Sequence, residues 1–313
     1  MSAIWTMGEL LVEVMRPRAG MPLDQAGEFI GPFPSGAPAI FIDTVARLGH
    51  PAGIIGGVGR DDFGSCLLAR LRGDGVDCRL VVERDDRSTG VAFVTYFADG
   101  SRKFIYHIGN SAAEVKEVPT LSGVSEPRFF HVMGCSLLAS EPFREAILGT
   151  LNAFVEKGAK VSFDPNIRPE LLRTRSLESI VGPVMAQCSV LFPGEEEILL
   201  LSGAATVEDA AERLFENPTL ELIVVKRGGR GSCVFSRDAR LEVGVYEVDA
   251  VDPTGAGDAF DAAFLCGMLE SKSPQECARF ATAAGALTTA AFGPMEGQIS
   301  QASMAQIMAS GLV

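Results

Sequence analysis

The stretch Asp252-Pro-Thr-Gly-Ala-Gly-Asp258 decides how this sequence is interpreted, because glycines and carboxylates meet there at the start of an apolar segment. Within residues 259–269, Phe260, Phe264 and Met268 recur with the spacing of one helix face. A glycine-rich turn that opens a buried helix presents backbone N–H groups and the positive end of the helix dipole. The stretch therefore predicts an anion hole suited to a phosphoryl group in transfer.

Asp258 lies in the first turn of this predicted helix, where the helix dipole favours an ionised carboxylate. Such a carboxylate beside an anion hole can accept the proton of a hydroxyl group while phosphate is transferred to its oxygen. The alternative is an aspartate that only caps the helix. We expect Asp258 to be the catalytic base and the backbone of Gly255, Ala256 and Gly257 to form the anion hole.

Short apolar runs alternate with segments of helical period along the rest of the chain. The runs that we interpret as strands are residues 54–58, 128–133, 160–163, 189–192, 222–225 and 245–250. Residues 143–157 and 207–215 have a period near that of a helix. This alternation predicts an α/β fold with a doubly wound, mostly parallel sheet flanked by helices.

Charged or glycine-rich segments follow four of these predicted strands. In open α/β sheets, ligands bind beyond the carboxyl ends of the strands. We therefore expect the site at the sheet edge formed by residues 164–168, 193–197, 226–231 and 251–258.

Residues 91–97 and 103–107 alternate in polarity around Asp99-Gly100, which is a hairpin signal. An antiparallel hairpin within a strand–helix chain indicates a second, smaller sheet. We expect one domain over residues 1–313, with a discontinuous β lid at about 9–34 and 90–109 over a cleft. The alternative is a surface hairpin without a role.

The composition excludes several classes of protein. With 313 residues, 47% of them hydrophobic and 21% charged, the chain can bury a large core and is not generally disordered. The net charge of −13 argues against nucleic acid or a membrane surface as a partner. Seven cysteines without a Cys-x-x-Cys pair, together with the lack of a signal peptide or a transmembrane run, lead us to expect a cytoplasmic protein.

Other phosphate-binding motifs are missing. The sequence has no P-loop, and Asp62 stands where a dinucleotide-binding loop would have its third glycine. No protein-kinase catalytic loop accompanies the glycines. Three histidines leave little material for a zinc site or a Ser-His-Asp triad.

Two segments carry a resemblance to a known family. Asp252-Pro-Thr-Gly-Ala-Gly-Asp-Ala-Phe260 resembles the C-terminal signature of the ribokinase-like (PfkB) carbohydrate kinases. Gly56-Gly-Val-Gly-Arg-Asp-Asp-Phe-Gly64 resembles their N-terminal signature. The chain looks closest to the 2-keto-3-deoxygluconate kinase, fructokinase and tagatose-kinase-like members. The resemblance implies a ribokinase-like fold, ATP and Mg²⁺ as cofactors, and a homodimer formed through the β lid.

The resemblance also implies roles for individual residues. Glu197 would hold Mg²⁺ through water, whereas Asp252 and Thr254 would form a site for a monovalent cation such as K⁺. The nucleotide-binding residues would be Lys226, Gly228, Gly229, Gly231 and Thr282. Gly194 departs from the family pattern, since it replaces the asparagine of an Asn-x-x-Glu motif.

The residues implied to bind substrate are Glu9, Gly36, Ala37, Phe93, Tyr106, His107, Arg168 and Asp258. Ile40 stands where relatives place a sugar-binding asparagine, and His107 where keto-acid kinases carry an arginine. Both departures weaken the assignment to a sugar acid, so a ketohexose such as tagatose or fructose competes closely with 2-keto-3-deoxygluconate.

We therefore expect ATP-dependent, in-line phosphorylation of a primary hydroxyl of a small sugar or sugar acid. The alternatives are a nucleoside kinase of the same fold, a non-catalytic sugar sensor and, less consistent with the motifs, a dehydrogenase.

Overall fold

The computed structural model describes residues 3–98, 101–167 and 176–313. Its main feature is a sheet with the strand order β13-β12-β11-β10-β9-β8-β1-β4-β5. The strands from β11 to β5 pair in parallel, and β12 and β13 add antiparallel pairs at one edge. The doubly wound, mostly parallel sheet expected from the sequence is thus confirmed. The strands are β1 (Ile4–Met7), β4 (Ala52–Gly59), β5 (Asp77–Arg84), β8 (Phe129–Met133), β9 (Lys160–Asp164), β10 (Cys188–Leu191), β11 (Leu222–Lys226), β12 (Ser232–Phe235) and β13 (Arg240–Val243).

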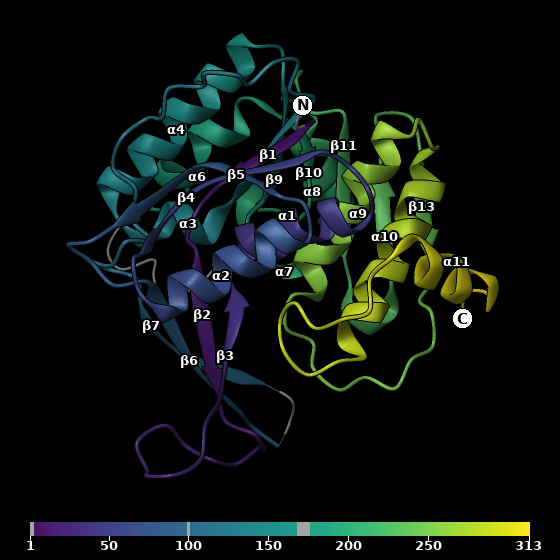
Figure 1. The fold of residues 1–313 in the computed structure, drawn as a ribbon. Coiled ribbons are helices and arrows are strands. Elements are labelled where there is room, and N and C mark those ends of the chain that lie inside the picture. The colour runs from purple at the N-terminus through teal and green to yellow at the C-terminus, as the bar shows by residue number, and fades with distance from the viewer. Residues whose placement is uncertain (1–2, 99–100, 168–175) are drawn as a thin grey trace.

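Helices cover both faces of this sheet because its strands are apolar on both sides (Figure 1). In β1, for example, Ile4 faces one core and Trp5 the other. One face carries α1 (Ala37–Arg47), α2 (Asp62–Gly73), α9 (Ala256–Leu269), α10 (Pro274–Thr289) and α11 (Gln301–Ala309). The other carries α3 (Gly134–Ala139), α4 (Glu141–Glu156), α6 (Leu177–Met185), α7 (Glu195–Ser202) and α8 (Val207–Leu214). A short 3-10 turn, Gly228–Arg230, follows β11.

The strand order reverses at β1. From β1 the chain adds β4 and β5 on one side, and it then crosses to β8 and continues outward on the other. A crevice forms outside the carboxyl ends of strands at such a switch point. Glu9 follows β1 and Cys135 follows β8, so both lie at this crevice.

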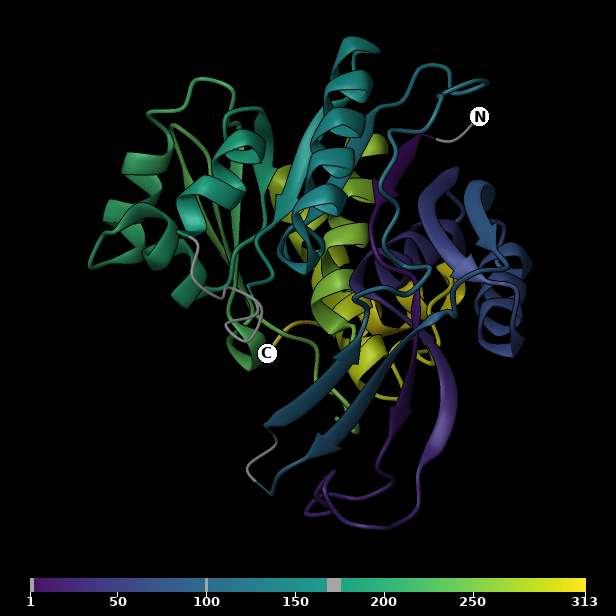
Figure 2. The same ribbon diagram turned by 90° about the vertical axis from the view of Figure 1, so that its left-hand side faces the viewer.

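A second, smaller sheet projects from one end of the molecule (Figures 1 and 2). It contains β2 (Leu11–Met15), β3 (Ile30–Ser35), β6 (Gly90–Tyr96) and β7 (Arg102–His107), in the order β3-β2-β6-β7. We call it the small sheet. β2 pairs with β6 in parallel, which joins two segments that are distant along the chain, and the other pairs are antiparallel. The expected turn at Asp99-Gly100 lies outside the described residues.

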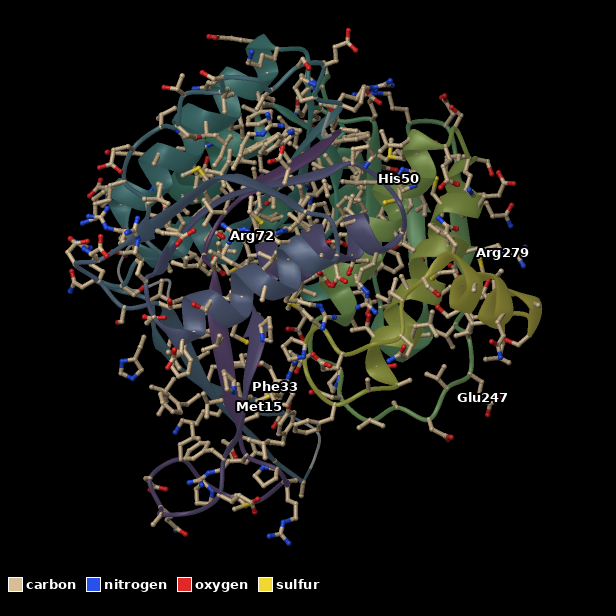
Figure 3. All side chains as sticks on the ribbon, viewed as in Figure 1. Met15, Phe33, His50, Arg72, Glu247 and Arg279 are labelled. Atoms are coloured by element: carbon tan, nitrogen blue, oxygen red, sulfur yellow. The ribbon has the colours of Figure 1, made fainter. Side chains whose placement is uncertain are left out.

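Residues 245–250, which we expected to form a strand, belong to no sheet. This prediction was wrong: β13 stays at the edge of the large sheet, with β12 as its only partner strand. The backbone of Val245 instead bonds the last residue, Val313, whose N–H donates to the Val245 carbonyl at 2.8 Å. The segment then runs irregularly to α9, and Glu247 marks it in Figure 3, where Met15 and Phe33 mark the small sheet.

No helix among the described residues is long and apolar enough to cross a membrane. All seven cysteines fall within the described ranges, and each is a free thiol.

Candidate active site

Two cavities meet at the carboxyl ends of the central strands. The inner cavity, of about 260 Å³, is lined by residues of the small sheet together with the start of α9. The outer cavity, of about 710 Å³, lies between β11, the segment before α9, and α10. Lys226, Pro253 and Gly257 line both cavities. Of the predicted site residues, the inner cavity brings together Glu9, Gly36, Ala37, Tyr106, Glu197, Lys226, Thr254, Gly255, Gly257 and Asp258.

Helix α9 begins at Gly255, which has φ +81°. A Cβ at this position would lie 2.5 Å from the Pro294 carbonyl oxygen and 3.0 Å from Cγ2 of Ile40, so only glycine fits. The Ala256 N–H donates to the Pro253 carbonyl at 3.3 Å and closes the turn. The N–H groups in the first turn of a helix form a site that favours anions. Gly257, in the first turn of α9, lines both cavities, so this end of the helix is suited to an anion.

Asp258 is buried, with 8% of its surface exposed, and it lines the inner cavity. Asn166 donates from Nδ2 to Oδ1 of Asp258 at 3.4 Å. Asn166 has φ +38°, and its N–H donates to Asp164 at the end of β9 at 3.1 Å. The turn after β9 thus holds an amide against the expected base. Asn166 belongs to the segment 164–168 that the sequence placed at the site edge.

A buried ion cluster lies beside the base. The Lys226 ammonium donates to Asp164 at 2.8 Å and to Asp261 at 3.1 Å. Burial strongly raises the pKa of Asp261, while for Asp164 the effect of burial is outweighed by Lys226 and its pKa is lowered. Burial alone would lower the pKa of Lys226, but the two aspartates raise it, so the ammonium stays charged. The cluster therefore keeps a fixed cation where the two cavities meet.

Glu197 is held by the backbone on both sides. Its Oε1 accepts the Ile167 N–H and its Oε2 accepts the Gly194 N–H, each at 2.7 Å. Position 194 thus holds Glu197 through its backbone N–H, and glycine supplies this group as well as the asparagine of the family pattern does. Burial raises the pKa of Glu197. Because both oxygens already accept hydrogen bonds, this carboxylate fits a metal reached through water, as Mg²⁺ often is. Among the described residues, no three His, Cys, Asp or Glu side chains cluster tightly enough to ligate a metal directly.

Two buried glutamates shape the far end of the inner cavity. Glu9 accepts hydrogen bonds from the Ser136 hydroxyl and, at 3.4 Å, from the Cys135 thiol. Glu13, on β2, accepts from the Ser35 hydroxyl at 2.6 Å. Sequence reasoning missed Glu13, although the period of two places it on the same face of β2 as Leu11, which also lines the cavity.

The small sheet presents only one of its faces to the inner cavity. Tyr106 lines the cavity and stacks on Phe104, with ring centroids 5.3 Å apart. The expectation that Phe93 and His107 also bind substrate is not supported, because both lie on the opposite face, their rings 5.9 Å apart. In the register of the sheet, Phe93 lies opposite the exposed Ile105. Arg168 lies outside the described residues.

The outer cavity holds the predicted nucleotide-side residues Gly228, Gly229, Gly231 and Thr282, together with Ala256. At Gly231, which has φ +80°, a Cβ would lie 2.0 Å from the Val243 carbonyl oxygen. The cavity is largely apolar elsewhere, with Tyr246, Val248 and Phe260 among its lining residues. This combination suits a flat, partly apolar group that carries phosphates.

Asp252 and Thr254 lie directly before α9 and are bound to the small sheet. The Tyr96 hydroxyl donates to Oδ2 of Asp252 at 2.9 Å, and Nη1 of Arg102 donates to the Thr254 hydroxyl at 2.7 Å. Sequence reasoning assigned no role to either donor.

The family model for pfkB family carbohydrate kinases matches residues 23–301. Fructokinase-1 from Oryza sativa subsp. japonica is 34% identical over 315 residues, covering 97% of each chain. The chain belongs to the pfkB family of carbohydrate kinases. The kinase also resembles solved structures. A crystal structure described as a putative ribokinase II from E.coli, in complex with ATP and Mg²⁺, is 38% identical with a TM-score of 0.93, covering 99% of this chain and 100% of that one.

A second solved structure is a fructokinase double mutant from Vibrio cholerae O395, in a form with fructose, ADP and potassium ion bound. It is 26% identical to the kinase with a TM-score of 0.81, and the match covers 98% of each chain. These matches confirm the ribokinase-like fold and the carbohydrate kinase activity expected from the two signatures.

Proposed function

We propose that the kinase transfers the γ-phosphoryl group of ATP to a primary hydroxyl of a neutral ketohexose such as fructose or tagatose. The observation that carries this proposal is the position of Asp258 and the first turn of α9 at the boundary between the two cavities. A sugar in the inner cavity and a nucleotide in the outer cavity would meet there.

In this mechanism Asp258 accepts the hydroxyl proton while its Oδ1 is held by Asn166. The N–H groups of the first turn of α9 and the Lys226 ammonium offset the charge that develops on the phosphoryl oxygens. Glu197 would hold Mg²⁺ through water ligands, and the bound ion would supply positive charge to the nucleotide phosphates. The small sheet acts as a lid that keeps bulk water from the phosphoryl group.

The charge of the inner cavity favours a neutral sugar. Glu9 and Glu13 are both buried there, with 5% of their surfaces exposed, and Asp258 adds a third carboxylate. A sugar acid would bring its own carboxylate among these groups, whereas hydroxyl groups can donate to them. The curated relatives are named fructokinases, which supports the same choice. The intact base and anion hole also argue against a non-catalytic sensor. A nucleoside base is typically bound by stacking on aromatic side chains. Of the aromatic side chains among the described residues, only Phe104 and Tyr106 line the inner cavity, which argues against a nucleoside kinase.

A coupled ATP assay with fructose, tagatose, 2-keto-3-deoxygluconate and a nucleoside tests this proposal. We expect turnover with the ketohexoses and little with the acid. Asp258→Asn is expected to lower kcat by about 10²–10⁴ because it removes the proton acceptor but keeps the size of the side chain. Asp238→Asn, an exposed change away from both cavities, is the matched control. Turnover of Asp258→Asn close to that of the control would refute the assignment.

We also propose a homodimer formed through the outer face of the small sheet. Ile105 is 42% exposed on this face, and Phe29 lies beside Phe93 on it with their ring centroids 5.7 Å apart. Phe97, directly after β6, is 44% exposed. Ile105→Lys should shift a dimer towards monomer in sedimentation velocity experiments, while a monomeric wild-type protein would contradict the proposal. The free thiols support our assignment of the kinase to the cytoplasm.

A further inference from the structure

Protein groups donate four hydrogen bonds to Asp252, in the segment before the anion hole. Oδ1 of Asp252 accepts the Thr254 N–H at 2.9 Å and the Thr254 hydroxyl at 2.7 Å. Oδ2 accepts the Tyr96 hydroxyl at 2.9 Å and the Gly293 N–H at 3.0 Å. An ionised carboxylate has about four acceptor positions, so all of those on Asp252 are in use. Asp252 has no solvent-exposed surface.

Thr254 is satisfied in the same way. Its hydroxyl gives its proton to Asp252 and accepts from Nη1 of Arg102 at 2.7 Å. Arg102 comes from β7 of the small sheet and carries a full positive charge. A monovalent cation ligated by Asp252 and Thr254 would have to displace one of these donors and lie next to a guanidinium. The two residues therefore do not fit the cation site that the family resemblance implies.

We propose that Arg102 and Tyr96 take the place of a monovalent cation at Asp252 and Thr254, so that the small sheet itself orders the start of α9 and the kinase works without K⁺. Arg102 places a permanent charge where an ion would otherwise provide one. Tyr96 supplies a neutral donor to the carboxylate. Both are positioning residues, since they act on the anion hole through residues 252–254.

This arrangement connects the small sheet to the anion hole. Residues 252–254 lead directly into Gly255, whose conformation starts α9. Two of the hydrogen bonds on the Asp252–Thr254 pair come from the hairpin β6–β7, so they exist only while that hairpin lies against the segment. Covering the inner cavity and ordering the anion hole would then be a single event.

The test compares wild type, Arg102→Ala, Tyr96→Phe and Lys103→Ala in KCl and in N-methylglucamine chloride of equal ionic strength. Lys103 is the matched control, because it is a cation on the same hairpin whose side chain is exposed. kcat and KM for ATP are measured by the coupled assay. Thermal unfolding in the same two salts gives a second readout that needs neither substrate nor activity.

We expect the wild type and Lys103→Ala to have the same kcat and the same melting temperature in both salts. Arg102→Ala should lose about tenfold or more in kcat in N-methylglucamine, and K⁺ should restore much of this loss and raise its melting temperature. Tyr96→Phe keeps the ring and should acquire a smaller K⁺ response.

A wild type that needs K⁺ for turnover, or that K⁺ specifically stabilises, would overturn the proposal. An Arg102→Ala variant that matches Lys103→Ala in both salts, or that K⁺ does not restore, would also overturn it. The inference rests on the proposed function only for the kinetic measurements. If the kinase phosphorylates none of the sugars tested, the melting temperatures still decide whether the site takes a cation.

Discussion

Replacing Gly255 by alanine tests whether the backbone at the start of α9 is as tightly constrained as the geometry indicates. Gly255 has φ +81°, a conformation that costs other L-residues about 1–2 kcal/mol. The added Cβ would also lie 2.5 Å from the Pro294 carbonyl oxygen, a contact that real Cβ atoms essentially never make, and 3.0 Å from Cγ2 of Ile40, which is tight. Relieving such overlaps by small backbone shifts costs about 1–3 kcal/mol. The sum is about 2–5 kcal/mol of unfolding free energy.

Gly158 provides the control for backbone strain alone. It has φ +86° after α4, and a Cβ there would meet nothing within 4 Å. Gly158→Ala should therefore lose only about 1–2 kcal/mol. Urea unfolding at equilibrium, followed by circular dichroism, measures both variants, and the expected difference between them is about 1–3 kcal/mol.

The two variants should differ more in catalysis than in stability. In Gly255→Ala the clash moves the first turn of α9, and a displacement of about 1 Å from the reacting group can lower kcat about 10²-fold. Gly158→Ala should leave kcat unchanged because it lies far from both cavities. Equal unfolding free energies for the two variants, or a normal kcat for Gly255→Ala, would refute the reasoning.

Three further predictions concern buried ionisable groups. Lys226→Met should lower kcat about 10²–10³-fold, because it removes the cation where the two cavities meet. Asp261→Asn should remain close to wild type, because burial raises the pKa of Asp261 and so favours the uncharged form that asparagine mimics. The coupled assay measures both variants, and an inactive but folded Asp261→Asn would contradict the second prediction. Burial lowers the pKa of His131 from 6.5 to about 3. Between these two pH values the imidazole is protonated in the unfolded chain but neutral in the folded one, so the free energy of unfolding falls as pH drops below 6.5. The loss of unfolding free energy approaches about 5 kcal/mol near pH 3. Urea unfolding between pH 7 and 4 should show that the unfolding free energy of His131→Gln depends less on pH than that of the wild type. An equal pH dependence in the two proteins would exclude His131 as the cause.

The sequence predicted those features of the fold and site that depend on local patterns. Alternating apolar runs and helical segments were enough for the doubly wound sheet, since each such run must be buried on both faces. The glycines and aspartate of residues 252–258 were enough for the start of α9, because no other residue tolerates the conformation and contacts of Gly255. These features need no knowledge of the rest of the chain.

Features that depend on the choice between two faces or two partners could not be predicted in this way. An alternating strand identifies two faces but not which one covers a cavity, so the sequence did not separate Tyr106, which lines the inner cavity, from His107, which lies on the opposite face. The pattern at 245–250 is strand-like, yet the backbone of Val245 pairs with the last residue, Val313, and not with a strand of the sheet. Asp261 could have been found, because it lies one helical turn after Asp258. Arg102 could not, because its partner Thr254 is 152 positions away.

The position of α9 in the chain also has a consequence for synthesis. Glu9 and Asp258 line the same cavity but are 258 − 9 = 249 residues apart. At about 5–20 residues per second, a ribosome needs about 12–50 seconds to add the second after the first. For most of that interval the strands β1, β4 and β5 have been synthesised and α9 has not, although α9 later covers apolar residues such as Ile40. The nascent chain therefore exposes an incomplete core for most of its synthesis, and exposed apolar surface of this kind is prone to aggregation until the last helices are made.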